Sequence, residues 1–345
     1  MEPSGSRPIF IVGANRSGTT LLRLMLNAHP RIAIPEELLY FRSFFAGAPV
    51  EAWRQPNLSP PAYANLIHEF VNRVVQLHSE LDGPALTREI LMNGTNDLRH
   101  PYTIVLNAWA RAHGKPRWGE KTPGNLFYVD IIQEMYPDAH FVYVVRDPRA
   151  GVASMIKTDF FPDDTVFNAL SRRKHDHVGR RLLERYVNPN QWMIVRYEDL
   201  TLNPETILRD VCGHIGEDYD PAMLAYHRTS STFMKEEAAT IFNAAATRPV
   251  TTKRIDSWKQ DLQARDVALI ESICSTEMER YGYQPVTSGL PLAVRPEKWL
   301  KSAYWWLQSM RNRHIRHYTV KHPIFARLRN RLGGLTRQTV INRSS

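Results

Sequence analysis

Short apolar runs alternate with segments of helical periodicity along much of the chain. The apolar runs lie at residues 8–13, 140–145 and 192–196, and the periodic segments that follow them lie at 18–28, 148–157 and about 204–215. Each pair predicts a buried strand, a short loop and a helix. Strands that alternate with helices favour a parallel sheet with right-handed crossovers. We therefore expect an α/β fold of three layers, a parallel sheet flanked by helices.

A long helical pattern separates the first two of these units. It runs over roughly residues 60–94 and 103–135 and is punctuated by turn pairs such as Pro60-Pro61. Open α/β folds bind their ligands at the carboxyl edge of the sheet, so we interpret this stretch as an insertion over that edge. Residues 221–285 are again mainly helical in pattern, with an interruption at 243–257.

The loop between the first strand and the first helix reads Gly13-Ala14-Asn15-Arg16-Ser17-Gly18-Thr19-Thr20. Its two glycines have the spacing of a phosphate-binding loop, in which backbone N–H groups and a helix N-terminus face an anion. A nucleoside-triphosphate site would carry a lysine after the second glycine, where this chain has Thr19. Arg16 offers a cation suited to a single terminal phosphate or sulfate. A turn that needs glycine only for its backbone is the alternative.

A second cationic site follows the second strand. Arg146 leaves the carboxyl end of that strand, and Ser154 lies about two helical turns further on. Both side chains can therefore reach one anion above the sheet. A capped helix start with a surface ion pair is the simpler reading of Arg146-Asp147-Pro148. Two anion sites on one sheet suggest a nucleotide that is phosphorylated at both ends.

These segments together resemble the sulfotransferases that use 3′-phosphoadenosine-5′-phosphosulfate (PAPS). The loop from Arg16 resembles the family's 5′-phosphosulfate loop, and Arg146 with Ser154 resembles its 3′-phosphate site. Three further segments are similar to the tyrosylprotein sulfotransferase branch and its bacterial relatives: Ala28-His29-Pro30, Pro35-Glu36-Glu37 and Tyr197-Glu198-x-Leu200. The resemblance covers roughly residues 8–285. It implies a P-loop NTPase-like sulfotransferase fold for a domain of residues 1–285.

The resemblance also implies roles for three side chains in in-line sulfuryl transfer. Glu37 takes the position of the catalytic base, with Glu36 as the neighbouring alternative. Lys121 takes the position of the lysine that contacts the sulfuryl group and the leaving oxygen, and Arg16 shares that task. From the residues alone, an acidic pair at a helix start and a solvated lysine before a helix near Gly124 are the alternatives.

The residues implied for donor binding come from four segments of the chain. They are Arg16, Ser17, Gly18, Thr19, Thr20, Arg146, Ser154, Tyr197, Lys253 and Arg254. Tyr197 has a core position as its alternative, and Lys253 with Arg254 has a solvated basic loop. Sulfuryl transfer needs no metal, and the chain contains neither Cys-x-x-Cys nor His-Glu-x-x-His.

The acceptor is left open by the sequence. After Glu36-Glu37 the family's arginine-containing segment is replaced by Leu38-Leu39-Tyr40-Phe41, which we interpret as an apolar wall. Such a wall suits a phenol, a sugar ring or a lipid-linked acceptor better than an acidic peptide. Two other functions compete with this one: an atypical P-loop kinase or NTPase, and a non-catalytic protein that binds membranes or nucleic acid. A homodimer also remains open.

The net charge of +9 changes this interpretation little, because the positive charge is concentrated at one end of the chain. Residues 291–345 hold twelve lysines and arginines against one acid, Glu297, so the rest of the chain is slightly acidic. A nucleic-acid partner is therefore not expected for the main body. The extension, residues 286–345, mixes these cations with aromatic side chains. It predicts an amphipathic helix that either contacts a membrane through 295–332 or packs on the domain.

The expected compartment is the cytoplasm, at the membrane face if the tail binds lipid. The chain has only two cysteines, Cys212 and Cys274, and so no disulfide framework. We also find no signal-peptide pattern and no apolar run of about 20 residues.

Overall fold

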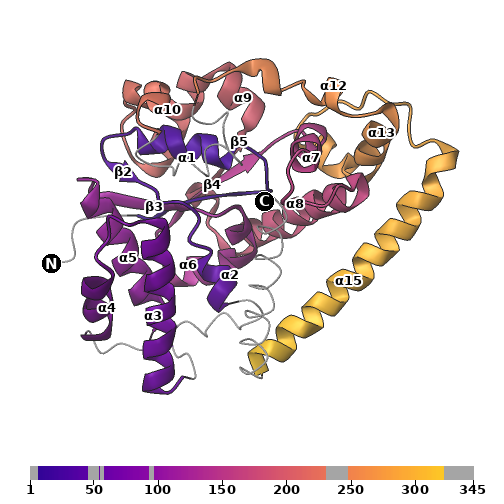
Figure 1. The fold of residues 1–345 in the computed structure, drawn as a ribbon. Helices are drawn as coiled ribbons and strands as arrows, with labels where there is room; N and C mark the ends of the chain where they lie inside the picture. Colours follow the sequence, from indigo (N-terminus) through magenta and orange to yellow (C-terminus); the bar gives the residue numbers. More distant parts are fainter. Residues whose placement is uncertain (1–6, 46–53, 55–57, 93–96, 231–247, 322–345) are drawn as a thin grey trace, which may run out of the picture.

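The structure is a computed structural model. It describes residues 7–45, 54, 58–92, 97–230 and 248–321, with the backbone alone at 309–321. Within this part of the chain one sheet has the strand order β2-β3-β1-β4-β5, and all neighbouring strands are parallel (Figure 1). The strands are β1 (Ile9–Gly13), β2 (Ile32–Ala33), β3 (Arg117–Lys121), β4 (His140–Val145) and β5 (Trp192–Arg196).

Helices cover both faces of the sheet. On one face lie α1 (Thr19–Asn27), α9 (Tyr197–Leu202), α10 (Pro204–Ile215) and the 3₁₀ segment η4 (Pro221–Arg228); on the other lie α5 (Arg99–Ala112), η2 (Pro123–Tyr128), α6 (Val129–Met135) and α8 (Thr165–Tyr186). This arrangement confirms the predicted three-layer α/β fold. The predicted strands at 8–13, 140–145 and 192–196 are β1, β4 and β5, and each is followed by a helix.

The remaining elements extend these layers. They are α2 (Tyr40–Phe44), α3 (Pro60–Leu77), α4 (Gly83–Met92), α7 (Pro148–Ile156), η3 (Pro189–Gln191), η6 (Thr252–Arg254), α12 (Trp258–Asp261), α13 (Ala264–Ile273), α14 (Ser275–Arg280), η7 (Leu292–Val294) and α15 (Arg295–Lys321). Helices α7, α13, α14 and α15 all contact α8. Asp147 caps α7, because its carboxylate accepts a hydrogen bond from the backbone N–H of Arg149.

The prediction of a helical stretch at 103–135 is wrong at its centre, where β3 lies between β1 and β2. Three of its five residues are charged, so it lacks the apolar pattern of a buried strand. The fold tolerates these charges because each has partners. Arg117 NH1, for example, donates to the carbonyl of Ile215 at 2.7 Å and to Glu217 at 3.1 Å.

The helices of the predicted insertion cover a face of the sheet instead of its carboxyl edge. Helix α5 packs against β2 and β3, and α4 packs against both α5 and α3. Helix α3 buries Ile67, Phe70, Val71 and Val74 on one side, at the spacing of an amphipathic helix. The expectation of an insertion over the edge is therefore wrong for most of the stretch, and of the described residues of α3, α4 and α5 only Leu77, at the end of α3, lines the cavity found at that edge.

The basic tail begins with a helix, as the sequence predicted. Helix α15 lies against α8 at the side of the domain (Figure 1). The boundary between a domain of residues 1–285 and an extension of 286–345 stays a prediction, and residues 322–345 lie outside the described part. Over the residues that are described, no helix is both long enough and apolar enough to cross a membrane.

Candidate active site

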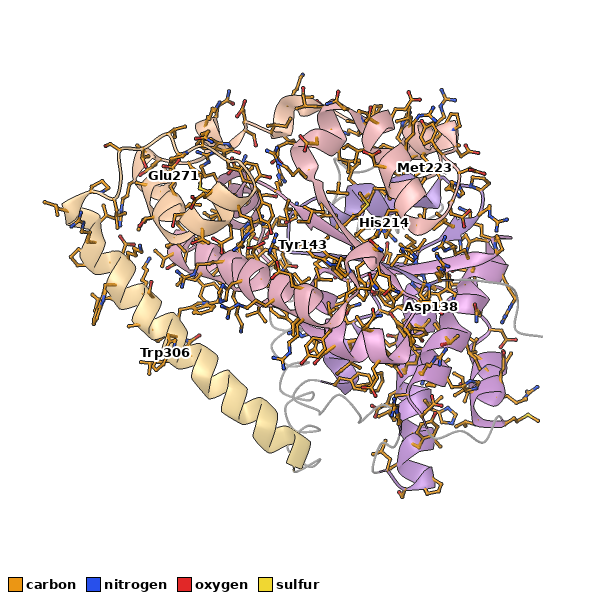
Figure 2. The ribbon with its side chains drawn as sticks, turned by 180° about the vertical axis from the view of Figure 1, so that it is seen from behind. Asp138, Tyr143, His214, Met223, Glu271 and Trp306 are labelled. Carbon is orange, nitrogen blue, oxygen red and sulfur yellow. The ribbon has the colours of Figure 1, made fainter. Side chains whose placement is uncertain are left out.

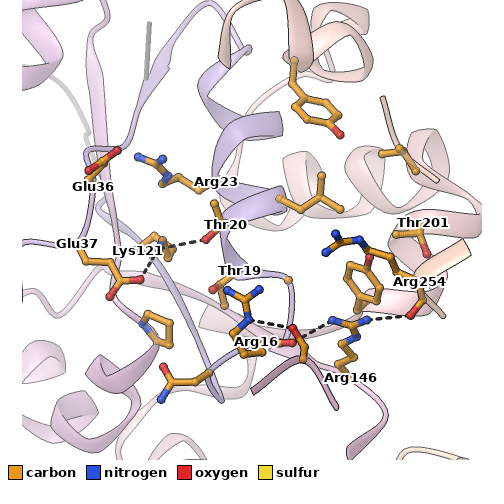
Figure 3. A pocket seen from close by; sticks show the side chains of 18 of the residues that line it. Arg16, Thr19, Thr20, Arg23, Glu36, Glu37, Lys121, Arg146, Thr201 and Arg254 are labelled. Atoms are coloured by element: carbon orange, nitrogen blue, oxygen red, sulfur yellow. Dashed lines mark hydrogen bonds and ion pairs between the residues drawn. The ribbon is translucent and has the colours of Figure 1, made fainter. Parts of the chain in front are cut away.

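A cavity of about 340 Å³ opens where β1, β3 and β4 end. Because these strands are parallel, the segments that follow them meet at one edge of the sheet. The cavity is lined by Arg16 and Gly18 to Thr20 from the first loop, by Glu36 and Glu37, by Lys121 at the end of β3, and by Arg146, Ser154, Tyr197 and Arg254 (Figure 3). Segments far apart in the sequence thus converge on one site.

The loop after β1 holds a backbone shape that disfavours most side chains. Arg16 has φ of 64°, a left-handed conformation that non-glycine residues seldom adopt, and Gly18 has φ of 97°. A Cβ on Gly18 would lie 2.4 Å from the ring of Tyr197, so glycine is required there on two grounds. The loop is thus folded tightly against Tyr197, and α1 begins directly behind it.

The predicted second cationic site is joined to this loop. Arg16 Nε donates to Ser154 Oγ at 3.0 Å, and Arg146 NH1 donates to the carbonyl of Arg16 at 3.2 Å. Arg146 also donates to the carbonyl of Arg254 at 2.9 Å and stacks its guanidinium over Tyr197 at 4.2 Å. The two sites that the sequence predicted separately are one continuous surface.

Three arginines crowd this end of the cavity. Burial lowers the pKa of Arg16, and the neighbouring charges of Arg146 and Arg254 lower it further. Burial also lowers the pKa of Arg146, whose Nε has no hydrogen-bond partner among the described residues. A bound anion would relieve both effects, because it stabilises the charged guanidinium groups. The surface therefore fits a ligand with phosphate or sulfate groups.

The other end of the cavity holds an ion pair. Lys121 Nζ lies 2.5 Å from Glu37 Oε1 and 3.4 Å from Thr20 Oγ1. The Lys121 side chain is buried, whereas that of Glu37 is 40% exposed. Lys121 therefore joins the acid to the phosphate loop, and Glu37 presents its carboxylate to the cavity.

Arg23 lies beside this pair, and the sequence analysis missed it. Its side chain is buried on α1, and within the described residues neither Nε nor NH1 has a hydrogen-bond partner. Figure 3 shows it pointing toward Glu36. Burial lowers the pKa of Arg23, against the opposing effect of Glu36 and Glu37. Its place on α1, three and four residues after Thr20 and Thr19, could have revealed it, since such positions share one face of a helix.

Arg172 was also missed, although it holds the loop from below. Its NH1 donates to the carbonyl of Asn15 at 2.6 Å, and its NH2 donates to Ser17 Oγ and to the carbonyl of Arg146, both at 3.2 Å. Arg172 is buried on α8. It is a positioning residue, because it ties the loop after β1 to the end of β4.

Two predicted donor-binding residues do not line the cavity. Ser17 is fully buried beneath the loop, where Arg172 contacts it. Lys253 is exposed, and its neighbours Thr251 and Arg254 take the places at the cavity wall. The remaining predicted residues do line the cavity: Arg16, Gly18, Thr19, Thr20, Arg146, Ser154, Tyr197 and Arg254.

The predicted apolar wall at Leu38-Leu39-Tyr40-Phe41 is wrong. Tyr40 and Phe41 are buried in the core, where Tyr40 stacks on Tyr102 at 4.5 Å and donates to the carbonyl of Leu98 at 2.6 Å. These aromatic residues follow the acidic pair closely in the sequence, but they lie on α2 with their side chains buried in the core. The apolar part of the cavity lining comes from other segments: Leu77, Pro123, Phe160, Phe161, Tyr226 and Val250.

Glu120 lies beneath the ion pair as a buried acid. Thr122 Oγ1 donates to its Oε1 at 2.5 Å, and Asn125 contacts its Oε2. Burial is the main cause that raises the pKa of Glu120 to about 7, and the nearby Glu37 raises it as well. The carboxyl therefore takes up its proton much closer to neutral pH than an exposed glutamate does. In the described ranges, no group of three or more His, Cys, Asp or Glu side chains is placed to hold a metal ion.

The fold and the cavity define a class of protein: a parallel α/β protein with a cationic cavity, suited to phosphate-like or sulfate-like anions, at the carboxyl edge of its sheet. Residues 8–221 match the sulfotransferase family, and the chain belongs to that family. It is therefore a transferase that moves a sulfuryl group. Membership of this family argues against the two other functions considered from the sequence, an atypical P-loop kinase or NTPase and a non-catalytic binding protein.

Relatives with established names are distant in sequence. The protein-tyrosine sulfotransferase of Drosophila melanogaster is 24% identical over 310 residues, which cover 85% of this chain and 54% of that protein. Protein-tyrosine sulfotransferase 1 of Danio rerio is 26% identical over 294 residues, covering 80% of this chain and 72% of that protein.

Solved structures share the fold. The sulfotransferase domain of the Synechococcus PCC 7002 olefin synthase aligns with a TM-score of 0.58 at 20% identity, covering 82% of this chain and 98% of that domain. The sulfotransferase domain from the curacin biosynthetic pathway aligns with a TM-score of 0.56 at 18% identity, covering 84% of this chain and all of that domain.

Proposed function

We propose that this enzyme transfers the sulfuryl group of PAPS to the hydroxyl of an acceptor, with Glu37 as the general base. The observation that carries the proposal is the pairing of Lys121 with Glu37 beside the phosphate loop, at 2.5 Å. An acid and a cation held together next to an anion site are the groups that in-line sulfuryl transfer requires.

The cationic end of the cavity suits the donor. Arg146, Arg254 and Arg16 are crowded there, and their charges favour a ligand that carries several negative groups. PAPS would supply the sulfuryl group, and adenosine 3′,5′-bisphosphate would leave through its 5′-phosphate oxygen. Arg16 and the backbone of the loop would hold the end that carries the sulfuryl group, and Arg146 with Ser154 would hold the 3′-phosphate.

The chain's own groups then divide the reaction between them. Glu37 takes the proton of the acceptor hydroxyl as its oxygen bonds to sulfur, and the bond from sulfur to the phosphate oxygen breaks. Lys121 stabilises the negative charge that develops on that leaving oxygen. An ammonium group has three N–H donors, so Lys121 can hold Glu37 in place and still donate to a second oxygen.

The structure favours Glu37 over Glu36 as the base. Glu37 contacts Lys121, whereas Glu36 lies toward Arg23 at the same end of the cavity (Figure 3). Glu36→Gln is therefore a matched control for Glu37→Gln, with the same loss of charge one residue away. The class of acceptor stays open here among phenols, sugars and lipid-linked hydroxyls.

The test separates donor binding from transfer. Adenosine 3′,5′-bisphosphate should raise the melting temperature of the wild type and of both variants in EDTA. With labelled PAPS and a panel of phenols, sugars, lipids and tyrosine peptides, Glu37→Gln should lose about 100-fold or more in kcat, while Glu36→Gln keeps most of it. Full transfer by Glu37→Gln, or no melting shift in the wild type at saturating ligand, would contradict the proposal.

A further inference from the structure

Helix α15 has one side that packs on the domain. Lys298 Nζ donates to Ser272 Oγ at 2.6 Å, and Lys301 Nζ lies 2.7 Å from Asp164. Trp305 packs against a cluster of buried residues between α8 and α13. These contacts come from positions that share one face of the helix, so they fix which way the helix is turned.

The opposite side of α15 is apolar and exposed. Five large residues there are between 55% and 74% exposed: Trp299, Leu300, Tyr304, Trp306 and Leu307. At 100° per residue they fall within an arc of about 160°, which makes one continuous strip along the helix. Figure 2 shows Trp306 on the side turned away from the domain. We call these five residues the outer strip.

An exposed apolar strip of this kind indicates a binding surface. Two partners are considered, a second copy of this chain and a lipid bilayer, and charge distinguishes between them. Residues 291–345 carry twelve lysines and arginines against one acid. Two copies that paired through this strip would bring two strongly basic segments together, and these would repel each other. A bilayer with anionic headgroups has the complementary charge.

The residue types point to the same partner. Three of the five residues are tryptophan or tyrosine, whose rings combine an apolar body with a polar edge and favour the boundary between headgroups and acyl chains. A helix with such a strip, flanked by cations, lies in the plane of that boundary. We propose that α15 docks the enzyme on an anionic lipid surface through the outer strip. The proposal goes beyond sulfuryl transfer and does not depend on the donor or the acceptor.

The experiment uses the full chain and two sets of vesicles, phosphatidylcholine alone and phosphatidylcholine with phosphatidylglycerol. The wild type should co-sediment with the anionic vesicles, and raising the salt to about 0.5 M should weaken binding about tenfold, because screening removes the charge attraction. Neutral vesicles should bind about tenfold more weakly than anionic ones.

The variant Trp299→Ser/Trp306→Ser/Leu307→Ser tests the strip itself. It should lose binding to anionic vesicles by about tenfold or more, with an unchanged melting temperature and an unchanged melting shift with adenosine 3′,5′-bisphosphate. Those two readouts keep a failure of this proposal apart from a failure of the proposed function.

The matched control removes three apolar residues that are equally exposed elsewhere, as Met92→Ser/Leu202→Ser/Val286→Ser. It should bind anionic vesicles like the wild type. Wild-type protein that stays in the supernatant, or a strip variant that still binds, would overturn the proposal. The proposal would also be overturned if sedimentation velocity showed a dimer for the wild type and a monomer for the strip variant, while neither protein bound vesicles.

Discussion

Gly151→Ala should weaken donor binding although Gly151 touches no part of the cavity. Gly151 lies on α7, and a Cβ there would come within 2.2 Å of Cζ and NH1 of Arg172. These atoms are the end of a flexible side chain, so the backbone can stay in place while the guanidinium moves. The movement would break the hydrogen bonds from Arg172 to Asn15 and Ser17, which hold the phosphate loop.

The size of the effect follows from these contacts. A hydrogen bond from a charged donor contributes about 1.5–3 kcal/mol, so losing two costs about 3 kcal/mol or more. Alanine in a helix is favoured over glycine by about 0.5–1 kcal/mol, which raises folding stability but is the same in the free and bound protein and so cancels from binding. If ligand binding must restore the order of the loop, a loss of about 3 kcal/mol corresponds to on the order of 100-fold weaker binding of adenosine 3′,5′-bisphosphate.

Calorimetric titration of adenosine 3′,5′-bisphosphate into the variant measures this loss. Gly213→Ala is the matched control: it makes the same change in helix α10, where a Cβ would meet nothing within 4 Å. Gly213→Ala should bind as the wild type does and be slightly more stable. In an Arg172→Ala background, Gly151→Ala should have little further effect on affinity, because the contact it breaks is already absent. Binding of Gly151→Ala within about twofold of wild type would refute the argument.

Three further predictions concern the cavity. The effect of Glu120→Gln on the free energy of unfolding, relative to wild type, should be more favourable at pH 8 than at pH 5, by at most about 3 kcal/mol in urea denaturation. The pKa of Glu120 is about 7 in the folded protein and 4.5 ordinarily, so the stability of the wild type falls as pH rises between these values. Glutamine does not titrate, so the variant escapes this loss. An equal effect at both pH values would contradict this. Lys121→Ala should lower kcat for sulfuryl transfer by about 100-fold while the melting shift with adenosine 3′,5′-bisphosphate persists; an unchanged kcat would argue against its role. Arg146→Ala should weaken binding of that ligand by about tenfold or more, whereas Lys253→Ala, which removes an exposed cation outside the cavity, should not; equal losses in calorimetry would show that only net charge matters.

The sequence predicts the parts of this fold that follow apolar patterns. Strands β1 and β4 consist mainly of buried aliphatic and aromatic residues. The helix after β1 begins directly after Gly18, and the helix after β4 begins at Pro148, directly after the capping residue Asp147. Strand β3 escaped prediction because its charges are neutralised by residues far away in the sequence, such as Glu217 for Arg117. A pattern of neighbouring residues carries no information about such partners.

The same limit explains which site residues were found. Arg16 and Arg146 each follow a predicted strand, and the carboxyl edge of a parallel sheet brings such positions together. Lys121 is the last residue of β3, which was not predicted, so only the family resemblance pointed to it. Arg172 stands in the run Arg172-Arg173-Lys174, which reads as a solvated face of α8. Only the packing of α8 against the loop singles out the first of these three cations, and the sequence offers no signal for that choice.

Arg172 also bears on how the site can work without the lysine of a triphosphate loop. The loop is held from one side by Tyr197, whose ring covers Gly18, and from the other by Arg172. Arg16 between these contacts has a left-handed backbone, and such a conformation persists only where the surrounding structure supports it. The cost of ordering the loop is therefore met during folding, and an incoming anion finds its donors already in place. A loop preorganised in this way needs no flexible lysine to close over its ligand, and Lys121 pairs with Glu37 at the other end of the cavity.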